Sequence, residues 1–233
     1  MTTKLSALFL AGVVSLSLSP QAMAAFVLDG TRVIYNAGQK NASVQVTNAS
    51  DRTYGGQVWL TNTDQPKEAV YLVPSPSFFK VSAKGLQTVR ILNVNNGLPA
   101  DRESLFKLNV QEIPPKPDNT ADGSAVLSFA MNTQIKLFWR PQSLREGRPE
   151  AEKKLTTAQH DGQVWLKNPT PYYFAVTGIK RDGKKLTVQE RYISGLTTLP
   201  PFSEATTGLA AIDGKVSVDA IDDFGGVKNY AIN

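Results

Sequence analysis

The chain contains no cysteine and only one histidine, His160. Without a thiol it can form neither a disulfide nor a Cys-X-X-Cys redox pair, and it has no cysteine nucleophile. A single histidine excludes most zinc sites and most catalytic triads, because both depend on imidazole groups. These absences favour a binding or structural protein, and we expect neither a metal ion nor a cofactor.

The rest of the composition is that of an ordinary globular protein. Of the 233 residues, 41% are apolar, 9% aromatic and 19% charged. These proportions exclude an intrinsically disordered chain, a collagen and a coiled coil. The length allows one large domain or two small ones. The 25 Lys and Arg residues exceed the 20 Asp and Glu residues, but they are spread along the chain without a basic block. We therefore expect no binding of nucleic acid.

Residues 1–24 have the pattern of a cleaved signal peptide. Lys4 precedes an uncharged, mostly apolar run over 5–18, and Ala22-Met23-Ala24 fits the small-X-small site of a signal peptidase. The run of 14 residues is too short to span a bilayer. We expect an exported chain whose mature form begins at Ala25.

The mature chain is expected to be all-β. Apolar and polar residues alternate over 106–111, which is typical of a half-buried strand. Asp182-Gly183 lies between two strand-like runs and predicts a tight hairpin turn, in which both central residues need positive φ. No long segment has apolar residues at helical spacing. Runs rich in β-formers, separated by Gly, Asn, Asp and Pro, occur at 43–47, 57–61, 88–92, 106–110, 163–167, 174–179 and 215–218.

A change in composition divides the mature chain into two halves. Residues 141–153 contain two prolines, a glycine and many charges between two strand-rich segments. Each half has about the size of an immunoglobulin-like β-sandwich. We predict an N-terminal sandwich over 25–141, a hinge over 142–152 and a C-terminal sandwich over 153–233.

The segment 125–140 has the longest strand pattern in the chain. Its odd-numbered residues are apolar except Thr133, and its even-numbered residues are mostly polar. A strand of this length is much longer than the usual five or six residues. Two interpretations remain open. The strand bends between two sheets and buries its whole apolar row, or part of the row faces a partner that pairs with an exposed strand edge.

Several motifs resemble those of the periplasmic pilus-assembly chaperones of the chaperone/usher pathway, in the same order and with similar spacing. The resemblance covers nearly the whole mature chain. It rests on Gly30-Thr-Arg-Val-Ile-Tyr35, Leu98-Pro-Ala-Asp-Arg-Glu-Ser-Leu-Phe-Lys-Leu-Asn-Val-Gln-Glu-Ile-Pro-Pro115, Ile135-Lys-Leu-Phe-Trp-Arg-Pro141, Asn168-Pro-Thr-Pro-Tyr-Tyr173 and Asp223-Phe-Gly225.

The resemblance implies a function by strand addition. In that family two immunoglobulin-like domains meet at an angle, like the arms of a boomerang, and a pilus subunit binds in the cleft. The chaperone lends a long strand to a subunit that lacks its own last strand. Leu127, Phe129 and Met131 have the alternating positions whose side chains would enter the groove of the subunit. We expect a periplasmic protein that folds and caps subunits and delivers them to an outer-membrane usher without ATP.

The resemblance also assigns two polar sites. Arg32 and Lys136 resemble the pair that binds the C-terminal carboxylate of the subunit, and charge-assisted hydrogen bonds suit that role. Glu103, Arg140 and Asp223 resemble an interdomain salt bridge, in which one arginine serves two carboxylates. Asp222 replaces Asp223 in that cluster if the register is shifted by one residue.

The chain departs from the family pattern at two positions. Lys107 stands where an aromatic residue is common, and Trp139 replaces a Tyr or Phe. The short loop over 114–123 resembles the short-loop branch, which is associated with rod-like adhesive pili.

The sequence also contains a motif that is typical of an enzyme class. Two Ser-X-X-Lys sequences, at Ser77 and Ser104, match an acyl-enzyme motif, but both lie in strand-like runs whereas the motif requires a helix. We therefore expect no enzyme and no small-molecule substrate.

An exported carbohydrate-binding or adhesin module is the alternative, and it would bind through exposed aromatic residues. A pilus subunit is less consistent with two sandwiches and no cysteine. The sequence leaves open which subunits and usher are served, and whether free chains associate through the long strand.

Overall fold

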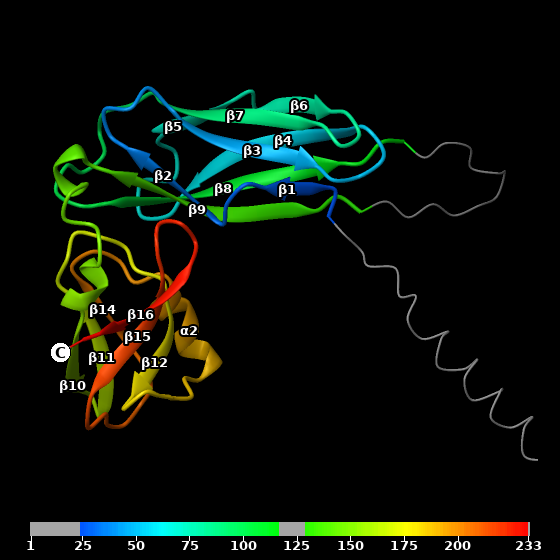
Figure 1. Ribbon diagram of the computed structural model, residues 1–233. Helices are drawn as coiled ribbons and strands as arrows, with labels where there is room; N and C mark the ends of the chain where they lie inside the picture. The colour runs from blue at the N-terminus through cyan, green and yellow to red at the C-terminus, as the bar shows by residue number, and fades with distance from the viewer. Residues whose placement is uncertain (1–23, 117–128, 233) are drawn as a thin grey trace, which may run out of the picture.

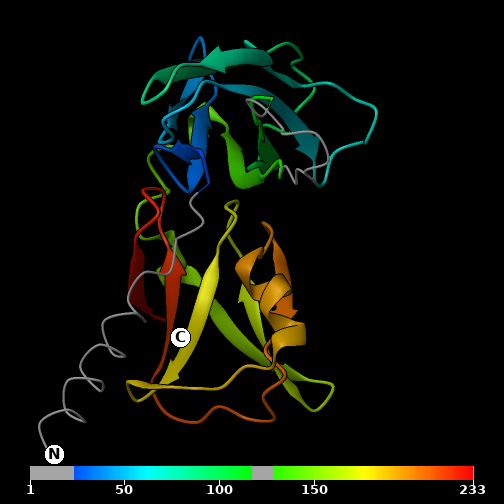
Figure 2. The same ribbon diagram turned by 90° about the vertical axis from the view of Figure 1, so that its right-hand side faces the viewer.

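The computed structural model describes residues 24–116 and 129–232, which form two β-sandwiches set at an angle to each other (Figures 1 and 2). The predicted all-β fold of two sandwiches in a boomerang arrangement is thereby confirmed. The signal-peptide prediction lies almost entirely outside the described residues. Among these residues no helix is both long enough and apolar enough to cross a membrane.

The N-terminal sandwich consists of two sheets that face each other. One has the strand order β1-β3-β7-β5 and the other the order β2-β9-β8-β4-β6. Alternate residues point inward and bury side chains such as Val46 and Ile91 against Leu108 and Leu137 of the opposite sheet. The strands are β1 Phe26–Leu28, β2 Arg32–Asn36, β3 Ala42–Asn48, β4 Tyr54–Asn62, β5 Leu72–Ser75, β6 Phe78–Val81, β7 Leu86–Asn93, β8 Ser104–Ile113 and β9 Asn132–Arg140.

The C-terminal sandwich is smaller and contains one helix. Its sheets have the orders β10-β11-β14 and β13-β12-β15-β16, and helix α2 packs against β14 and β12. The core includes Leu166, Ile179, Leu199 and Val218. The elements are β10 Thr156–His160, β11 Gln163–Asn168, β12 Val176–Arg181, β13 Lys184–Lys185, α2 Glu190–Thr197, β14 Ser203–Thr206, β15 Val216–Ile221 and β16 Val227–Ala231.

The turn and strand predictions agree with these elements. Each of the seven predicted runs overlaps an observed strand. Asp182 and Gly183 have φ angles of 49° and 79° and join β12 to β13 in a two-residue hairpin. The sequence pattern does not predict helix α2, because eight residues with only Leu196 fully buried give too short a periodic pattern.

The strand at the end of the first sandwich is shorter than the apolar pattern predicts. β9 begins at Asn132, and residues 129–131 before it are not in a strand, although the amide of Glu112 still donates to the carbonyl of Met131 at 2.9 Å. The part of the pattern before residue 129 lies outside the described residues. On the other side, β2 pairs with β9 only from Lys136 to Arg140. A strand needs neighbours for its backbone hydrogen bonds, and in the described part of the chain residues 132–135 pair with β8 alone. Residues 132–135 therefore have a free edge on the β2 side in the described part of the chain.

The polar face of the same sheet is less exposed than the alternation predicts. Asn109 on β8 is 2% exposed and accepts hydrogen bonds from the side chains of Asn132 and Gln134 on β9. Lys107 is exposed as predicted. The amide of Asn109 also donates to Thr61 Oγ1 at 3.2 Å. This polar network covers the sheet surface where a half-buried strand would otherwise face solvent.

Two short 3₁₀ helices, Gln142–Leu144 and Ala151–Lys154, connect the sandwiches. The sequence indicates a charged hinge here, but part of its charge is buried. Arg148 is 6% exposed and Glu152 is 0% exposed, and they form a bidentate ion pair with N···O distances of 3.0 and 2.8 Å. Because the two charges pair with each other, their attraction offsets part of the desolvation cost of burying both side chains.

Candidate binding cleft between the two sandwiches

The two predicted anchor residues lie side by side at the junction of the sandwiches. β2 and β9 are parallel neighbours, and Arg32 pairs in register with Lys136. Adjacent strands are about 4.8 Å apart, so the register places two cationic side chains next to each other. No salt bridge among the described residues includes either of them. The pair is therefore suited to bind an anion.

Lys136 extends from the first sandwich to the end of helix α2 in the second. Its Nζ donates to the carbonyl oxygen of Thr197 and to Thr198 Oγ1, the latter at 2.8 Å. Burial lowers the pKa of Lys136 to about 8, and the positive charges of Arg32 and Lys107 act in the same direction. An ammonium in this position is poised to gain an anionic partner, since such a partner would restore its pKa.

Arg32 also crosses the junction. Its Nη1 donates to the carbonyl oxygen of Ile221 at the end of β15, at 3.1 Å. The guanidinium carbon lies 6.0 Å from the centre of the Phe138 ring. Burial lowers the pKa of Arg32, although Asp223 opposes this effect. Its Nε is buried without a hydrogen-bond partner. Both anchor residues are thus held by main-chain carbonyls of the opposite sandwich.

The predicted donor residues leave the core at the other end of β9. Leu137 and Trp139 are buried and Ile135 is partly buried, whereas Met131 is 51% exposed and Phe129 is 72% exposed. Leu127 lies outside the described residues. The apolar row of one face therefore runs from the core into solvent, next to the free edge at residues 132–135.

Glu103, Arg140 and Asp223 lie together between the sandwiches. Arg140 Nε is 2.6 Å from Glu103 Oε1, and its Nη1 is 2.6 Å from Asp223 Oδ2. The second oxygen of Glu103 accepts the amide of Tyr173 in the other sandwich at 2.8 Å. Burial raises the pKa of Glu103, and Arg140 opposes this rise. One buried arginine thus joins a carboxylate from each sandwich.

Asp222 and Asp223 have different partners in the structure. Asp222 Oδ1 caps the turn by accepting the amides of Phe224 and Gly226, and Asp222 Oδ2 pairs with Lys228 at 2.8 Å. Of the two acids, it is Asp223 that reaches Arg140. Aspartate side chains often accept the amide two residues further on in a turn, as Asp222 does with Phe224, and this leaves Asp223 free to reach Arg140.

Sequence reasoning missed several residues at this junction. Arg148 Nε lies 3.3 Å from Asp223 Oδ1 and extends the ion-pair cluster to Glu152. Tyr173 donates its hydroxyl proton to Asp64 Oδ2 at 2.8 Å across the junction. Thr198 contacts Lys136. The charge-rich hinge gave a signal for Arg148, but nothing in sequence pairs residues as distant as Asp64 and Tyr173.

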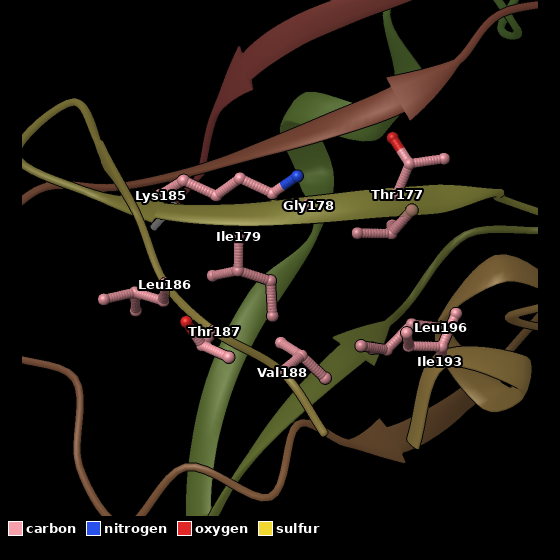
Figure 3. A pocket seen from close by; sticks show the side chains of 10 residues that line it. Thr177, Gly178, Ile179, Lys185, Leu186, Thr187, Val188, Ile193 and Leu196 are labelled. Atoms are coloured by element: carbon pink, nitrogen blue, oxygen red, sulfur yellow. The ribbon is translucent and has the colours of Figure 1, made fainter. Parts of the chain in front are cut away.

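A pocket of about 420 Å³ is formed by residues of the second sandwich (Figure 3), and neither Arg32 nor Lys136 lines it. Ile179, Leu186 and Val188 line one side, and Ile193 and Leu196 of α2 line the other. Helix α2 therefore packs on an apolar pocket and ends at the threonines that contact Lys136. The described residues contain no cluster of three His, Asp or Glu side chains arranged to hold a metal ion.

Comparison with known protein families gives two matches that together span almost the entire described chain. Residues 25–145 match the family described as pili and flagellar-assembly chaperone, PapD N-terminal domain. Residues 150–232 match the family described as pili assembly chaperone PapD, C-terminal domain.

Individual relatives give the same result. The chain is 43% identical over 214 residues to chaperone protein FanE of Escherichia coli, covering 92% of each chain. It is 36% identical to chaperone protein FimC of E. coli K12, covering 88% of this chain and 82% of FimC. Among solved structures, the Salmonella enterica SafA pilin–SafB chaperone complex has a matching chain with a TM-score of 0.74 and 27% identity, covering 90% of this chain and 96% of the other. The E. coli chaperone DraB has a TM-score of 0.73 and 30% identity, covering 88% and 96%.

Proposed function

The chain belongs to the PapD family of pilus-assembly chaperones, and from this membership we propose how it acts on pilus subunits. It binds a subunit in the cleft between its sandwiches, completes the fold of the subunit with its own strand and caps it against premature assembly. It then delivers the subunit to an outer-membrane usher. No catalytic step and no nucleotide are needed, because another strand can displace the lent one by exchange.

The observation that carries this proposal is the free edge of β9 beside an exposed apolar row. Residues 132–135 offer unpaired backbone groups on the β2 side, and Met131 and Phe129, just before them in the chain, offer exposed apolar side chains. A subunit strand that pairs here satisfies the backbone and buries both side chains. Each fully buried side chain of this size contributes about 1.5–3 kcal/mol before ordering costs.

The cation pair fixes the position of the subunit in this proposal. A C-terminal carboxylate between Arg32 and Lys136 accepts charge-assisted hydrogen bonds from both. Because side chains alternate along a strand, fixing its end determines which side chain enters which pocket. The cluster of Glu103, Arg140 and Asp223 keeps the two sandwiches at the angle that this arrangement needs.

Export to the periplasm is part of the proposal. The pattern of residues 1–24 is that of a signal peptide with cleavage after Ala24, and a subunit chaperone has to meet its subunits before they reach the outer membrane.

Co-purification tests the proposal directly. We would express the tagged full chain in its source cell, isolate it from the periplasm and identify bound proteins by mass spectrometry. Wild type is expected to retain a small secreted subunit. Phe129→Ser is expected to weaken retention about tenfold or more, because it removes one large buried side chain from the interface.

Phe78→Ser is the matched control for this test. Phe78 is 63% exposed and lies on β6, at the opposite edge of the sheet from β2. Its substitution should leave retention unchanged. If wild type retains no subunit, or if both variants lose it equally, strand donation is the wrong mechanism.

Thr198 is expected to assist the anchor from the second sandwich. Its hydroxyl oxygen accepts from Lys136, so its own proton is free to donate to a carboxylate bound at the same ammonium. Thr198→Val should weaken binding of a peptide with the C-terminal strand of the co-purified subunit about fivefold to tenfold, since one hydrogen bond contributes about 1 kcal/mol. Binding constants are measured by calorimetry.

Three controls accompany the Thr198 variant. Thr198→Ser keeps the hydroxyl and should bind like wild type. Thr187→Val makes the same change at a residue that lines the pocket of Figure 3 and makes no hydrogen bond with Lys136, and it should have no effect. A peptide with a C-terminal amide should bind more weakly and be insensitive to Thr198→Val. Equal weakening of both peptides would mean that Thr198 acts only on domain packing.

A further inference from the structure

Glu112 belongs to the Gln-Glu-Ile-Pro-Pro motif, yet the proposed function gives it no role. It is 6% exposed, near the end of β8. Its Oε2 accepts the backbone amides of Ala25, at 2.8 Å, and Phe26, at 3.1 Å. Its own amide donates to the carbonyl of Met131 at 2.9 Å. Glu112 therefore contacts both the start of β1 and the segment that leads into β9.

Glu112 differs from the other buried carboxylates of the described chain. Each of the others has a cationic partner: Glu103 pairs with Arg140, Glu152 with Arg148 and Asp222 with Lys228. No cationic side chain among the described residues pairs with Glu112. A buried carboxylate without a positive partner is costly, and two neutral amides offset only part of that cost.

The missing positive charge is supplied by cleavage of the signal peptide. Hydrolysis of the bond between Ala24 and Ala25 leaves a carboxylate on Ala24 and turns the amide nitrogen of Ala25 into an α-amine. That amine is protonated near neutral pH. Its nitrogen already lies 2.8 Å from Glu112 Oε2, and Ala25 is 5% exposed. The new ammonium would thus be formed in hydrogen-bond contact with the unpaired carboxylate.

We propose that Glu112 is the binding site for the α-ammonium group of Ala25, so that signal-peptide cleavage completes a buried ion pair in the first sandwich. This inference rests on the cleavage site in the proposed function. The backbone amide of Glu112 also donates to the carbonyl of Met131. The ion pair therefore keeps the new N-terminus next to the segment that leads into the proposed donor strand. The processed chain is consequently more stable than its precursor.

Two mature chains that differ by one residue test the proposal. One begins at Ala25 and the other at Ala24, each released from a removable N-terminal fusion. The structure already accommodates Ala24, so the extension adds no clash. The extra residue should lower the folded-to-unfolded ratio about tenfold, which is about 1.4 kcal/mol, in urea titrations. The same pair is made with Glu112→Gln, which keeps a neutral acceptor of the same shape.

The Glu112→Gln pair should show no effect of the extension. Equal stability of the two wild-type chains would overturn the ion pair, and so would a loss on extension that is as large with Glu112→Gln as without it. If Glu112→Gln does not fold, Nα-acetylation of the Ala25 chain replaces it. Acetylation must then cost as much as the extension, and a cost of zero overturns the proposal. The intact mass of the exported chain separately tests cleavage after Ala24. A failure of the ion-pair proposal can therefore be distinguished from a failure of the proposed cleavage site.

Discussion

Replacing Arg140 by alanine is expected to lower the free energy of unfolding by about 3–5 kcal/mol. Arg140 is the positive charge between Glu103, whose side chain is 1% exposed, and Asp223, whose side chain is 24% exposed. Without it, Glu103 keeps only the amide of Tyr173 as a partner in a buried site. The cost arises because one charge is left in the interior without its partner.

Urea unfolding measures this effect, and Lys153→Ala is the control. Lys153 pairs with Glu150 at 2.7 Å in the same connecting segment, but both side chains are more than half exposed. Its loss should change the free energy by less than about 1 kcal/mol. Similar effects for the two variants would show that the Arg140 cluster is not effectively buried.

A double variant separates stability from domain orientation. Glu103→Leu with Arg140→Met removes both buried charges and is expected to recover part of the stability lost in Arg140→Ala, because apolar residues can replace a buried ion pair. The angle between the sandwiches, measured by small-angle scattering, should nevertheless become variable. An unchanged angle would mean that contacts such as Tyr173 with Asp64 are sufficient to orient the domains.

Replacing Lys136 by methionine is expected to abolish subunit retention while leaving the fold intact. The variant loses the charge-assisted hydrogen bonds to the carboxylate, each contributing about 1.5–3 kcal/mol, which corresponds to a tenfold to hundredfold weaker complex. Its unfolding free energy should stay within about 1 kcal/mol of wild type, since methionine keeps the apolar part of the side chain. Retention with unimpaired strength would exclude Lys136 from the anchor.

If Lys136 is the proposed anchor, subunit binding is expected to depend on pH. Burial destabilises the protonated form of Lys136, so its pKa in the folded chain is about 8 and its ordinary value is 10.5. The cost of burying the ammonium disappears as the pH rises above about 8, because the side chain is then neutral. A bound carboxylate favours the protonated form and raises the pKa again. The dissociation constant should therefore increase by up to about tenfold per pH unit above pH 8, until the pKa of the complex is reached.

The pH dependence has a direct control. The charged groups facing Lys136 are Arg32 on β2 and Lys107 on β8, and the end of α2 contributes the neutral oxygens of Thr197 and Thr198. Lys136→Arg carries a charge that does not titrate in this range. It should bind with an affinity that is flat between about pH 7 and 9.5. A slope that persists in this variant would have to come from another group.

Much of the architecture follows from local patterns. Alternating apolar residues predict β8 and β9 of the first sandwich, runs rich in β-formers predict strands in both sandwiches, and Asp182-Gly183 predicts the hairpin where positive φ is needed. The apolar row of 125–140 predicts an unusually long strand and leaves open whether the row is buried internally or faces a partner in part. What the pattern does not give is where the strand ends, because that depends on which neighbours supply backbone hydrogen bonds. β9 starts at Asn132, and only β8 accompanies its first residues in the described part of the chain.

The two-sandwich fold, the turn residues and, through the motifs, the residues proposed for binding are all readable from the linear chain. They depend on side-chain periodicity and on short-range backbone geometry, which are properties of neighbouring residues. The folded arrangement was needed to place Arg32 in register with Lys136, to bring Asp223 rather than Asp222 to Arg140, and to set Thr198 against the anchor. Glu112 and Ala25 also meet only in the folded chain, 87 positions apart. Contacts at such separations depend on how whole sheets pack, and no local pattern encodes them.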